Sequence, residues 1–137
     1  MKVLIDTSVW SMALRKTKVT ESEKNIVDEL KELVLDLRVL MIGPIRQEIL
    51  TGISDEEKYE QLRDKISAFH DEILVTEDFE LAAKFSNECR RKGIQGSHTD
   101  FLICAVAVRS ESAIFTVDKD FAMYKKHIPI QLYRINN

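Results

Sequence analysis

Short apolar runs alternate with helix-forming segments along the chain, and this alternation constrains the fold more than any other feature. The runs span residues 3–6, 39–42, 73–75, 113–117 and 130–133. Continuous apolar runs predict strands buried on both faces, as in a parallel sheet covered by helices. The pattern predicts an α/β fold, in a three-layer α/β/α arrangement with a mainly parallel central sheet of four to five short strands. Pro129 precedes the last run, which we therefore expect at a sheet edge.

Helix signals fill the intervals between these runs. Helices are expected at residues 8–14, 20–37, from 43 to a break at 52–55, and at 54–70, 76–91, 100–108 and 121–125. Thr20 and Glu23 have the spacing of a capping box, Ser54 is placed to cap the 54–70 helix, and Thr76 or Asp78 to cap the next. The 100–108 segment is apolar on nearly every side, which predicts a central buried helix.

Composition favours one soluble domain. The 137 residues suffice for a single core, and we expect residues 1–137 to form one domain. No apolar run has the length that a membrane span requires. Cys89 and Cys104 lack C-x-x-C spacing, which argues against a disulfide framework or zinc site and favours a cytoplasmic location. The net charge of −3 argues weakly against a nucleic-acid partner, although acids gathered around a divalent cation would alter that balance.

Carboxylates follow two of the predicted strands. Asp6 ends the first, Asp118 ends the 113–117 strand, and Asp120 comes two residues later. Ligands of parallel α/β sheets bind outside the carboxyl ends of the strands, so these acids would face one crevice if the two strands are neighbours. Asp6 has an alternative role, because aspartate is also a favoured helix N-cap.

Two further acids lie on predicted helices. Glu48 shares an apolar helical face with Ile45 and Ile49, and Asp100 shares one with Ile103 and Cys104. A buried carboxylate requires a partner, so the alternative for Glu48 is an ion pair with an arginine such as Arg46. The alternative for Asp100 is a first-turn acid stabilised by the helix dipole.

Taken together, the acids favour a cation site. The chain offers no comparable set of buried bases, and converging carboxylates repel one another unless a cation lies among them. Oxygen ligands without a histidine or cysteine cluster favour Mg²⁺ or Mn²⁺ over zinc. We therefore expect a Mg²⁺ (or Mn²⁺) site.

Four ordered motifs resemble those of PIN-domain ribonucleases, and most closely the toxins of VapBC toxin–antitoxin modules. They are "VLIDTSVW", "GPIRQEILTG", "GSHTDFLICAVA" and "IFTVDKDF". The resemblance implies that the catalytic, metal-binding acids are Asp6, Glu48, Asp100 and Asp118, with Asp120 as an additional or alternative ligand. It leaves open which of Asp118 and Asp120 binds metal directly. Supporting hydroxyls would come from Thr7, Ser8 and Thr116.

By the same resemblance, the chain would be a metal-dependent endoribonuclease and the toxin of a type II toxin–antitoxin system. Its substrate would be structured RNA, tRNA or rRNA, cut to leave 5′-phosphate and 3′-hydroxyl ends. A cognate VapB-like antitoxin would silence it, and the helices at 20–37 and 54–70 would support a homodimer and the antitoxin. No membrane partner is implied.

Basic residues are candidates for RNA contacts. Arg15 and Lys16 follow the first helix, Lys119 follows the 113–117 strand, and Arg46 precedes Glu48 by two residues. Such side chains bind phosphates when they flank a site, and otherwise form ordinary solvated surface. His98 matches no catalytic position and is read as a loop histidine.

Three other protein classes each share a single feature with the predicted ribonuclease. A haloacid dehalogenase-type phosphotransferase also ends its first strand in aspartate, but it requires an acid two residues later, where this chain has Ser8. A receiver-like Mg-binding signalling module has a lysine that Lys119 imitates, but no third strand here ends in a phosphoacceptor. A PIN-like domain that binds RNA without cleaving it is disfavoured because all four acids are present.

Overall fold

A parallel sheet forms the centre of the molecule. The computed structural model describes residues 1–135, and its strands are β1 (Val3–Ile5), β2 (Val39–Leu40) and β3 (Ala113–Phe115), in the order β2–β1–β3. Both pairings are parallel, with Val3 opposite Val39 and Ile5 opposite Phe115. All residues of β1 are fully buried. The strands that carry acids at their ends are thus neighbours, as the crevice prediction required.

Single bridges extend the sheet at both edges. Leu132 pairs in parallel with Ile114, which confirms the edge position expected after Pro129. At the other edge Asp71 pairs in parallel with Met41. The predicted strand at residues 73–75 is wrong: pairing occurs two residues earlier, and Ile73 is 80% exposed. This short apolar run instead connects the bridge at Asp71 to the next helix. Its apolar character is explained by Leu74, which is partly buried and packs against the core.

Helices occupy the expected segments, with shifted ends. They are α1 (Thr7–Leu14), α2 (Glu21–Leu35), α3 (Gly43–Leu50), α4 (Glu56–Ile66), α5 (Thr76–Arg91), α6 (His98–Arg109) and α7 (Asp120–Lys125). The capping box of Thr20 and Glu23 is present at α2. The α4 helix is shorter than predicted, and Asp55 rather than Ser54 caps it by accepting from the Lys58 N–H at 2.9 Å. None of the helices within residues 1–135 combines the length and the apolarity needed to cross a membrane.

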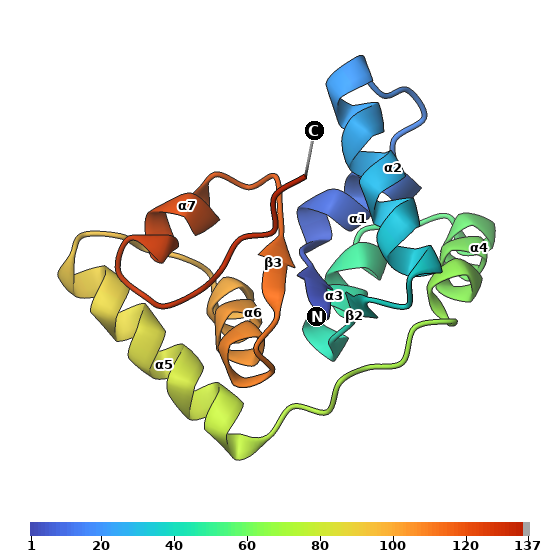
Figure 1. Cartoon of the computed structure of the whole chain (residues 1–137). Helices are drawn as coiled ribbons and strands as arrows, with labels where there is room; N and C mark the ends of the chain where they lie inside the picture. Colours follow the sequence, from blue (N-terminus) through green and yellow to red (C-terminus); the bar gives the residue numbers. More distant parts are fainter. Residues whose placement is uncertain (136–137) are drawn as a thin grey trace.

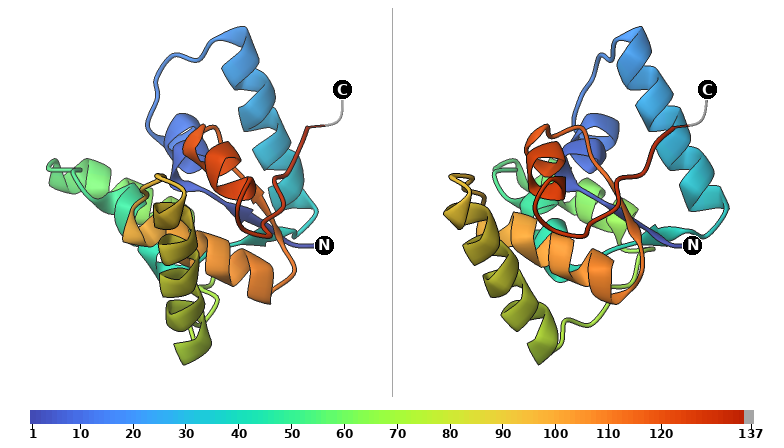
Figure 2. Two further views of the ribbon diagram at one scale, coloured as in Figure 1. Left: turned by 90° about the vertical axis from the view of Figure 1, so that its left-hand side faces the viewer. Right: turned by 60° about the vertical axis from the view of Figure 1, so that its left-hand side comes forward.

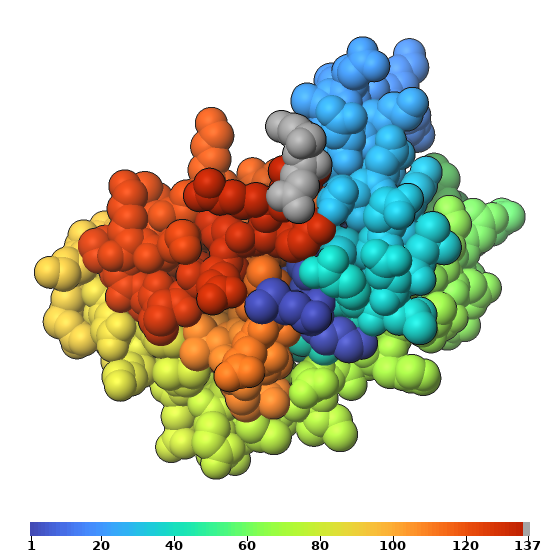
Figure 3. Space-filling model, in the orientation of Figure 1, coloured from blue at the N-terminus to red at the C-terminus, as the bar shows by residue number. Residues whose placement is uncertain are grey.

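The helices cover the sheet from two sides. In Figure 1, α5, α6 and α7 lie on one side of the strands, and α1 to α4 lie on the other. The α6 helix packs against β1 and β3, and α5 packs along α6, as the two turned views in Figure 2 show. Half of the twelve α6 residues are buried, all of them within residues 101–107, which confirms the predicted central helix. On the surface shown in Figure 3, the C-terminal third (orange to red) lies on the left and α2 (blue) lies at the upper right.

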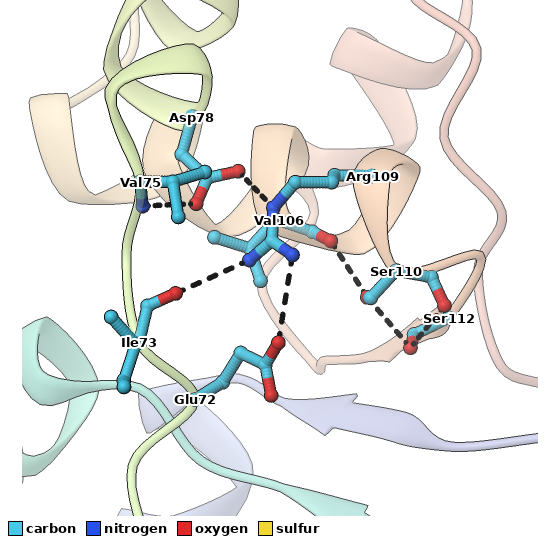
Figure 4. A network of polar contacts seen from close by, with 8 residues as sticks. All are labelled: Glu72, Ile73, Val75, Asp78, Val106, Arg109, Ser110 and Ser112. Carbon is cyan, nitrogen blue, oxygen red and sulfur yellow. Dashed lines mark hydrogen bonds and ion pairs between the residues drawn. The ribbon is translucent and has the colours of Figure 1, made fainter.

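An ion pair that sequence reasoning missed joins α5 to α6. Asp78 is fully buried, and its carboxylate accepts hydrogen bonds from the Arg109 Nε at 2.5 Å and from the Val75 N–H at 2.9 Å. Figure 4 shows the Arg109 guanidinium between Asp78, Glu72 and Ile73. The Glu72 carboxylate lies 3.5 Å from Nη1. The N-cap residue of α5 is Val75, neither of the two predicted, and Asp78 accepts its N–H from the third helical position. Asp78 thereby ties the start of α5 to the end of α6.

Candidate active site

Three carboxylates from separate elements converge beyond the carboxyl ends of the strands. Asp100, Asp118 and Asp120 each offer one oxygen within 4.8 Å of the other two. Asp100 comes from the first turn of α6, Asp118 from the segment after β3, and Asp120 from the first residue of α7. The cluster joins Asp118 and Asp120, which follow the 113–117 strand, to Asp100, which was expected on a helix, whereas Asp6 at the end of β1 is not one of the three.

A tight turn after β3 arranges two of these acids. The Thr116 hydroxyl accepts the Asp118 backbone N–H at 3.0 Å, and the Asp118 Oδ1 accepts the Asp120 N–H at 2.9 Å. Such side-chain-to-backbone bonds are the usual way in which threonine and aspartate shape a turn. The spacing "TVDKD" thus folds both acids back toward the same point, and both, not one, face Asp100.

Asp6 is held next to this cluster by hydroxyl groups. It is 5% exposed, and its Oδ2 accepts hydrogen bonds from the Ser8 hydroxyl at 2.7 Å and the Thr116 hydroxyl at 2.8 Å. Its backbone N–H donates to the Phe115 carbonyl at 2.9 Å, which fixes the end of β1 beside the end of β3. The Ser8 N–H lies 3.4 Å from Oδ2, so Asp6 also acts as the N-cap of α1. The cap role and a place at the site are compatible.

The pKa of Asp100 is shifted chiefly by burial and to a smaller extent by neighbouring negative charge. Burial raises the pKa of Asp100 above its ordinary value, and hydrogen bonds from Tyr124 and Ser97 oppose that rise. The negative charges of Asp6 and Asp118 add to the rise in pKa. Asp6 therefore belongs to the same electrostatic site, although its oxygens lie outside the set of three.

Glu48 sits at the margin of the site rather than in the core. Its side chain is exposed, and its Oε1 accepts a hydrogen bond from the Thr7 hydroxyl at 2.7 Å. The prediction of a buried Glu48 is wrong. The buried face of α3 contains Ile45 and Ile49 but is too narrow to include Glu48. Glu48 and Thr7 line a shallow hollow together with Thr99, the residue before Asp100.

Arg46 does not contact these acids. Its guanidinium donates to Asp71 at 2.9–3.0 Å and to the backbone carbonyls of Ile66 and Phe69. These bonds tie α3 to the end of α4, so the arginine is already occupied in the fold. The structure therefore contradicts the role of Arg46 as the partner of Glu48. Its role as a contact for RNA stays a prediction.

The remaining basic candidates lie near the site and differ in exposure and in whether their charge is paired. Arg15 and Lys16 line a hollow that also includes Ser8, the hydroxyl partner of Asp6. The Lys16 ammonium is paired with Glu23 at 2.5 Å, whereas Arg15 is exposed. Lys119 is exposed between the two turn acids. His98 is the exposed first residue of α6.

The donor set suits a hard divalent cation. The ion pairs found within residues 1–135 involve a different set of acids: Glu23, Glu60, Asp71, Glu72 and Asp78. Asp6, Asp100 and Asp118 instead accept hydrogen bonds from hydroxyl or backbone N–H groups, which orient a carboxylate without neutralising its charge. Clustered oxygen ligands of this kind match Mg²⁺ or Mn²⁺. The ion pair with an arginine that was the alternative for Glu48 is not found within residues 1–135.

Comparison with known protein families identifies the family of the chain. The PIN domain model matches residues 3–126. The chain belongs to the PIN-domain family. This membership confirms the family predicted from the four motifs and stands against the receiver-like and haloacid dehalogenase-type alternatives.

Solved structures share the PIN fold over nearly the whole chain. FitAcB from Neisseria gonorrhoeae is 17% identical, with 96% of each chain covered and a TM-score of 0.76. VapBC2 from Rickettsia felis, bound to a DNA fragment from its promoter, is 18% identical, covers 99% of this chain and 100% of its own, and has a TM-score of 0.76. DNA-bound VapBC from Salmonella typhimurium is 14% identical, with 97% of each chain covered and a TM-score of 0.72. The search of curated proteins finds no match.

Sequence reasoning missed one polar partner in this PIN domain. Tyr124, on α7, donates its hydroxyl proton to the Asp100 Oδ2 at 2.7 Å. In the sequence its position resembles an ordinary core aromatic, three residues after Phe121. Only the packing of α7 against the start of α6 reveals the hydroxyl contact.

Proposed function

We propose that this PIN domain is a metal-dependent endoribonuclease and the toxin of a type II toxin–antitoxin system. The observation that carries the proposal is the gathering of Asp100, Asp118 and Asp120 within 4.8 Å, with no cationic side chain paired to them within residues 1–135. Such uncompensated charge in a partly buried site favours a bound divalent cation. Family membership and the fold support a nuclease.

The acids divide into two groups by their position. Asp100, Asp118 and Asp120 would hold Mg²⁺ or Mn²⁺, with Asp6 beside them and Glu48 at the rim. When bound, a divalent cation supplies electrostatic stabilisation of the scissile phosphate and makes a hydroxide nucleophile accessible at neutral pH. Ser8 and Thr116 both donate to the Oδ2 of Asp6 and so fix the orientation of this carboxylate. Thr7 orients Glu48 in the same way.

The RNA backbone requires cationic contacts outside the acid cluster. Arg15 and Lys119 are exposed, and Arg15 lies in a hollow with Ser8. Lys16 can join them by exchanging its contact with Glu23 for a phosphate. Phosphate contacts position a nucleic acid without reading its sequence, which suits these three residues. Arg46 is left out of this set, because contact with a phosphate would require it to give up bonds to Asp71 and to two backbone carbonyls at once.

We infer a VapB-like antitoxin as partner, a homodimer as the assembled form and the cytoplasm as the location. The likeness in fold to chains of the VapBC complexes supports the antitoxin. Exposed apolar side chains on or next to α2, including Val19, Leu35 and Leu37, are compatible with a partner on that side of the molecule.

Metal dependence is the direct test of the proposed function. Purified protein freed of any antitoxin is expected to cleave structured RNA in the presence of Mg²⁺ or Mn²⁺ and to stop when EDTA is added. Restoring Mn²⁺ should restore cleavage, and end mapping should find 5′-phosphate and 3′-hydroxyl termini. Cleavage that continues unchanged in EDTA, or intact RNA at every Mg²⁺ and Mn²⁺ concentration, would refute the proposal.

The hydroxyl groups that hold Asp6 are expected to matter for activity. Thr116→Ala and Ser8→Ala each remove a donor to Oδ2, and each is expected to lower the cleavage rate about 10–100-fold, as is usual for partners of metal ligands. Ser67→Ala is the matched control, because its hydroxyl bonds only to the Asp64 carbonyl on α4. Initial rates on one RNA substrate measure the effect. Equal rates for all three variants would contradict the role of the hydroxyls.

A further inference from the structure

Tyr124 is fixed in the interior next to the acid cluster. It is fully buried on α7, and its ring lies against Phe101 and Phe121, with centroid distances of 4.9 and 5.3 Å. Its hydroxyl donates to the Asp100 Oδ2 at 2.7 Å. The two aromatic neighbours restrict the movement of the ring and so hold the hydroxyl at Asp100.

Gly96 leaves the space that this hydroxyl occupies. A Cβ atom at Gly96 would lie 2.2 Å from the Tyr124 Oη and 2.7 Å from its Cζ. It would also lie 2.9 Å from the Phe101 Cε2. These distances are far below van der Waals contact, and a buried tyrosine between two aromatic rings has little room to move. The loop before α6 therefore approaches the phenol closely only because residue 96 has no side chain.

We propose that Tyr124 is a positioning residue that holds Asp100 for the divalent cation, with Gly96 providing the room for its hydroxyl. The inference rests on the proposed function. A phenol occupies one carboxylate oxygen and brings no positive charge, so Asp100 keeps its attraction for a cation. A lysine or arginine in that place would orient the acid but also repel the metal.

The contact also couples the acids to one another. Tyr124 and Asp120 lie four residues apart on the same helix, so they share one rigid element. A hydrogen bond from Tyr124 to Asp100 therefore sets the distance between the Asp100 and Asp120 carboxylates. Such partners of metal ligands hold the ligand set in the geometry that binds.

The test compares two tyrosines that each donate to a carboxylate. Tyr124→Phe removes the hydroxyl at the site, and Tyr133→Phe removes one that donates to Glu29, away from the acid cluster. Mn²⁺ binding to the metal-free full chain is measured by calorimetry, and thermal unfolding is recorded without metal. We expect Tyr124→Phe to weaken Mn²⁺ binding about 10–100-fold, and Tyr133→Phe to leave it unchanged. Both variants should unfold at similar temperatures.

A second variant disturbs the contact between Tyr124 and Asp100 without removing the hydroxyl. Gly96→Ala retains the phenol but pushes it from its place, so it is also expected to weaken Mn²⁺ binding. Tyr124→Phe binding Mn²⁺ as tightly as Tyr133→Phe, or Gly96→Ala binding it as tightly as the wild type, would overturn the positioning role alone. A wild-type protein that binds no Mn²⁺ would instead overturn the proposed function, and this inference with it.

Discussion

Asp100→Asn is expected to lower the rate of RNA cleavage by on the order of 10²–10³-fold or more, the usual effect of removing a group that stabilises charge in the reaction. The amide retains the shape of the carboxylate and can still accept the hydrogen bond from Tyr124. It removes a full negative charge from the centre of the cluster, where Asp118 and Asp120 converge with Asp100. Single-turnover cleavage of one RNA substrate at saturating Mn²⁺ measures the loss.

The same substitution is expected to leave the metal-free protein at least as stable as the wild type. The pKa of Asp100 is raised in the folded chain, chiefly by burial. A carboxyl whose pKa is raised by folding binds its proton more tightly when folded, so its ionised form at neutral pH costs stability. Asparagine removes that cost, and the melting temperature at pH 7 without metal should not fall. Lowering the pH toward the raised pKa should narrow the difference, because the wild-type carboxyl is then protonated.

Two further variants serve as a parallel and a control for this prediction. Asp6→Asn, at the other strand end, is expected to lose activity similarly, because its charge acts on the same site. Asp64→Asn changes an exposed acid on α4 and should leave cleavage unchanged. Full activity in both Asp6→Asn and Asp100→Asn would refute the assignment of these acids to catalysis.

The largest loss of stability is expected from Asp78→Ala. The substitution leaves the Val75 N–H and the Arg109 guanidinium without their buried acceptor. Removing one partner of a buried ion pair costs about 3–5 kcal/mol, and the partial exposure of Arg109 reduces this to about 3 kcal/mol. For a domain of this size the melting temperature should fall by roughly 10 °C. Chemical denaturation, followed by circular dichroism, gives the free energy of unfolding.

Glu72→Ala provides the matched control on the same arginine. Glu72 contacts the same guanidinium (Figure 4). Its carboxylate lies 3.5 Å from the Arg109 Nη1, and its side chain is partly exposed. Such a pair contributes at most about 1 kcal/mol. If Asp78→Ala destabilises the chain no more than Glu72→Ala does, the buried pair does not hold α5 and α6 together as described.

The structure explains why some predictions failed while neighbouring ones were confirmed. The α3 helix was correctly placed, yet periodicity gives the direction of an apolar face and not its width, so the exposure of Glu48 escaped prediction. The 73–75 run was read as a strand because apolar content alone does not distinguish a strand from a connection held by one buried side chain. The burial of Asp78 depends on Arg109, 31 residues away, which no local pattern reveals.

The sequence by itself determined the order of strands and helices, the acids at the ends of the strands and the family motifs, because periodicity, capping and turn chemistry act over a few residues. Only the tertiary structure decided that Asp118 and Asp120 both face Asp100, that Glu48 lies at the rim, and that Tyr124 holds Asp100. Burial and hydrogen-bond partners are set by residues far apart in the chain, so they are known only once the helices have packed on the sheet.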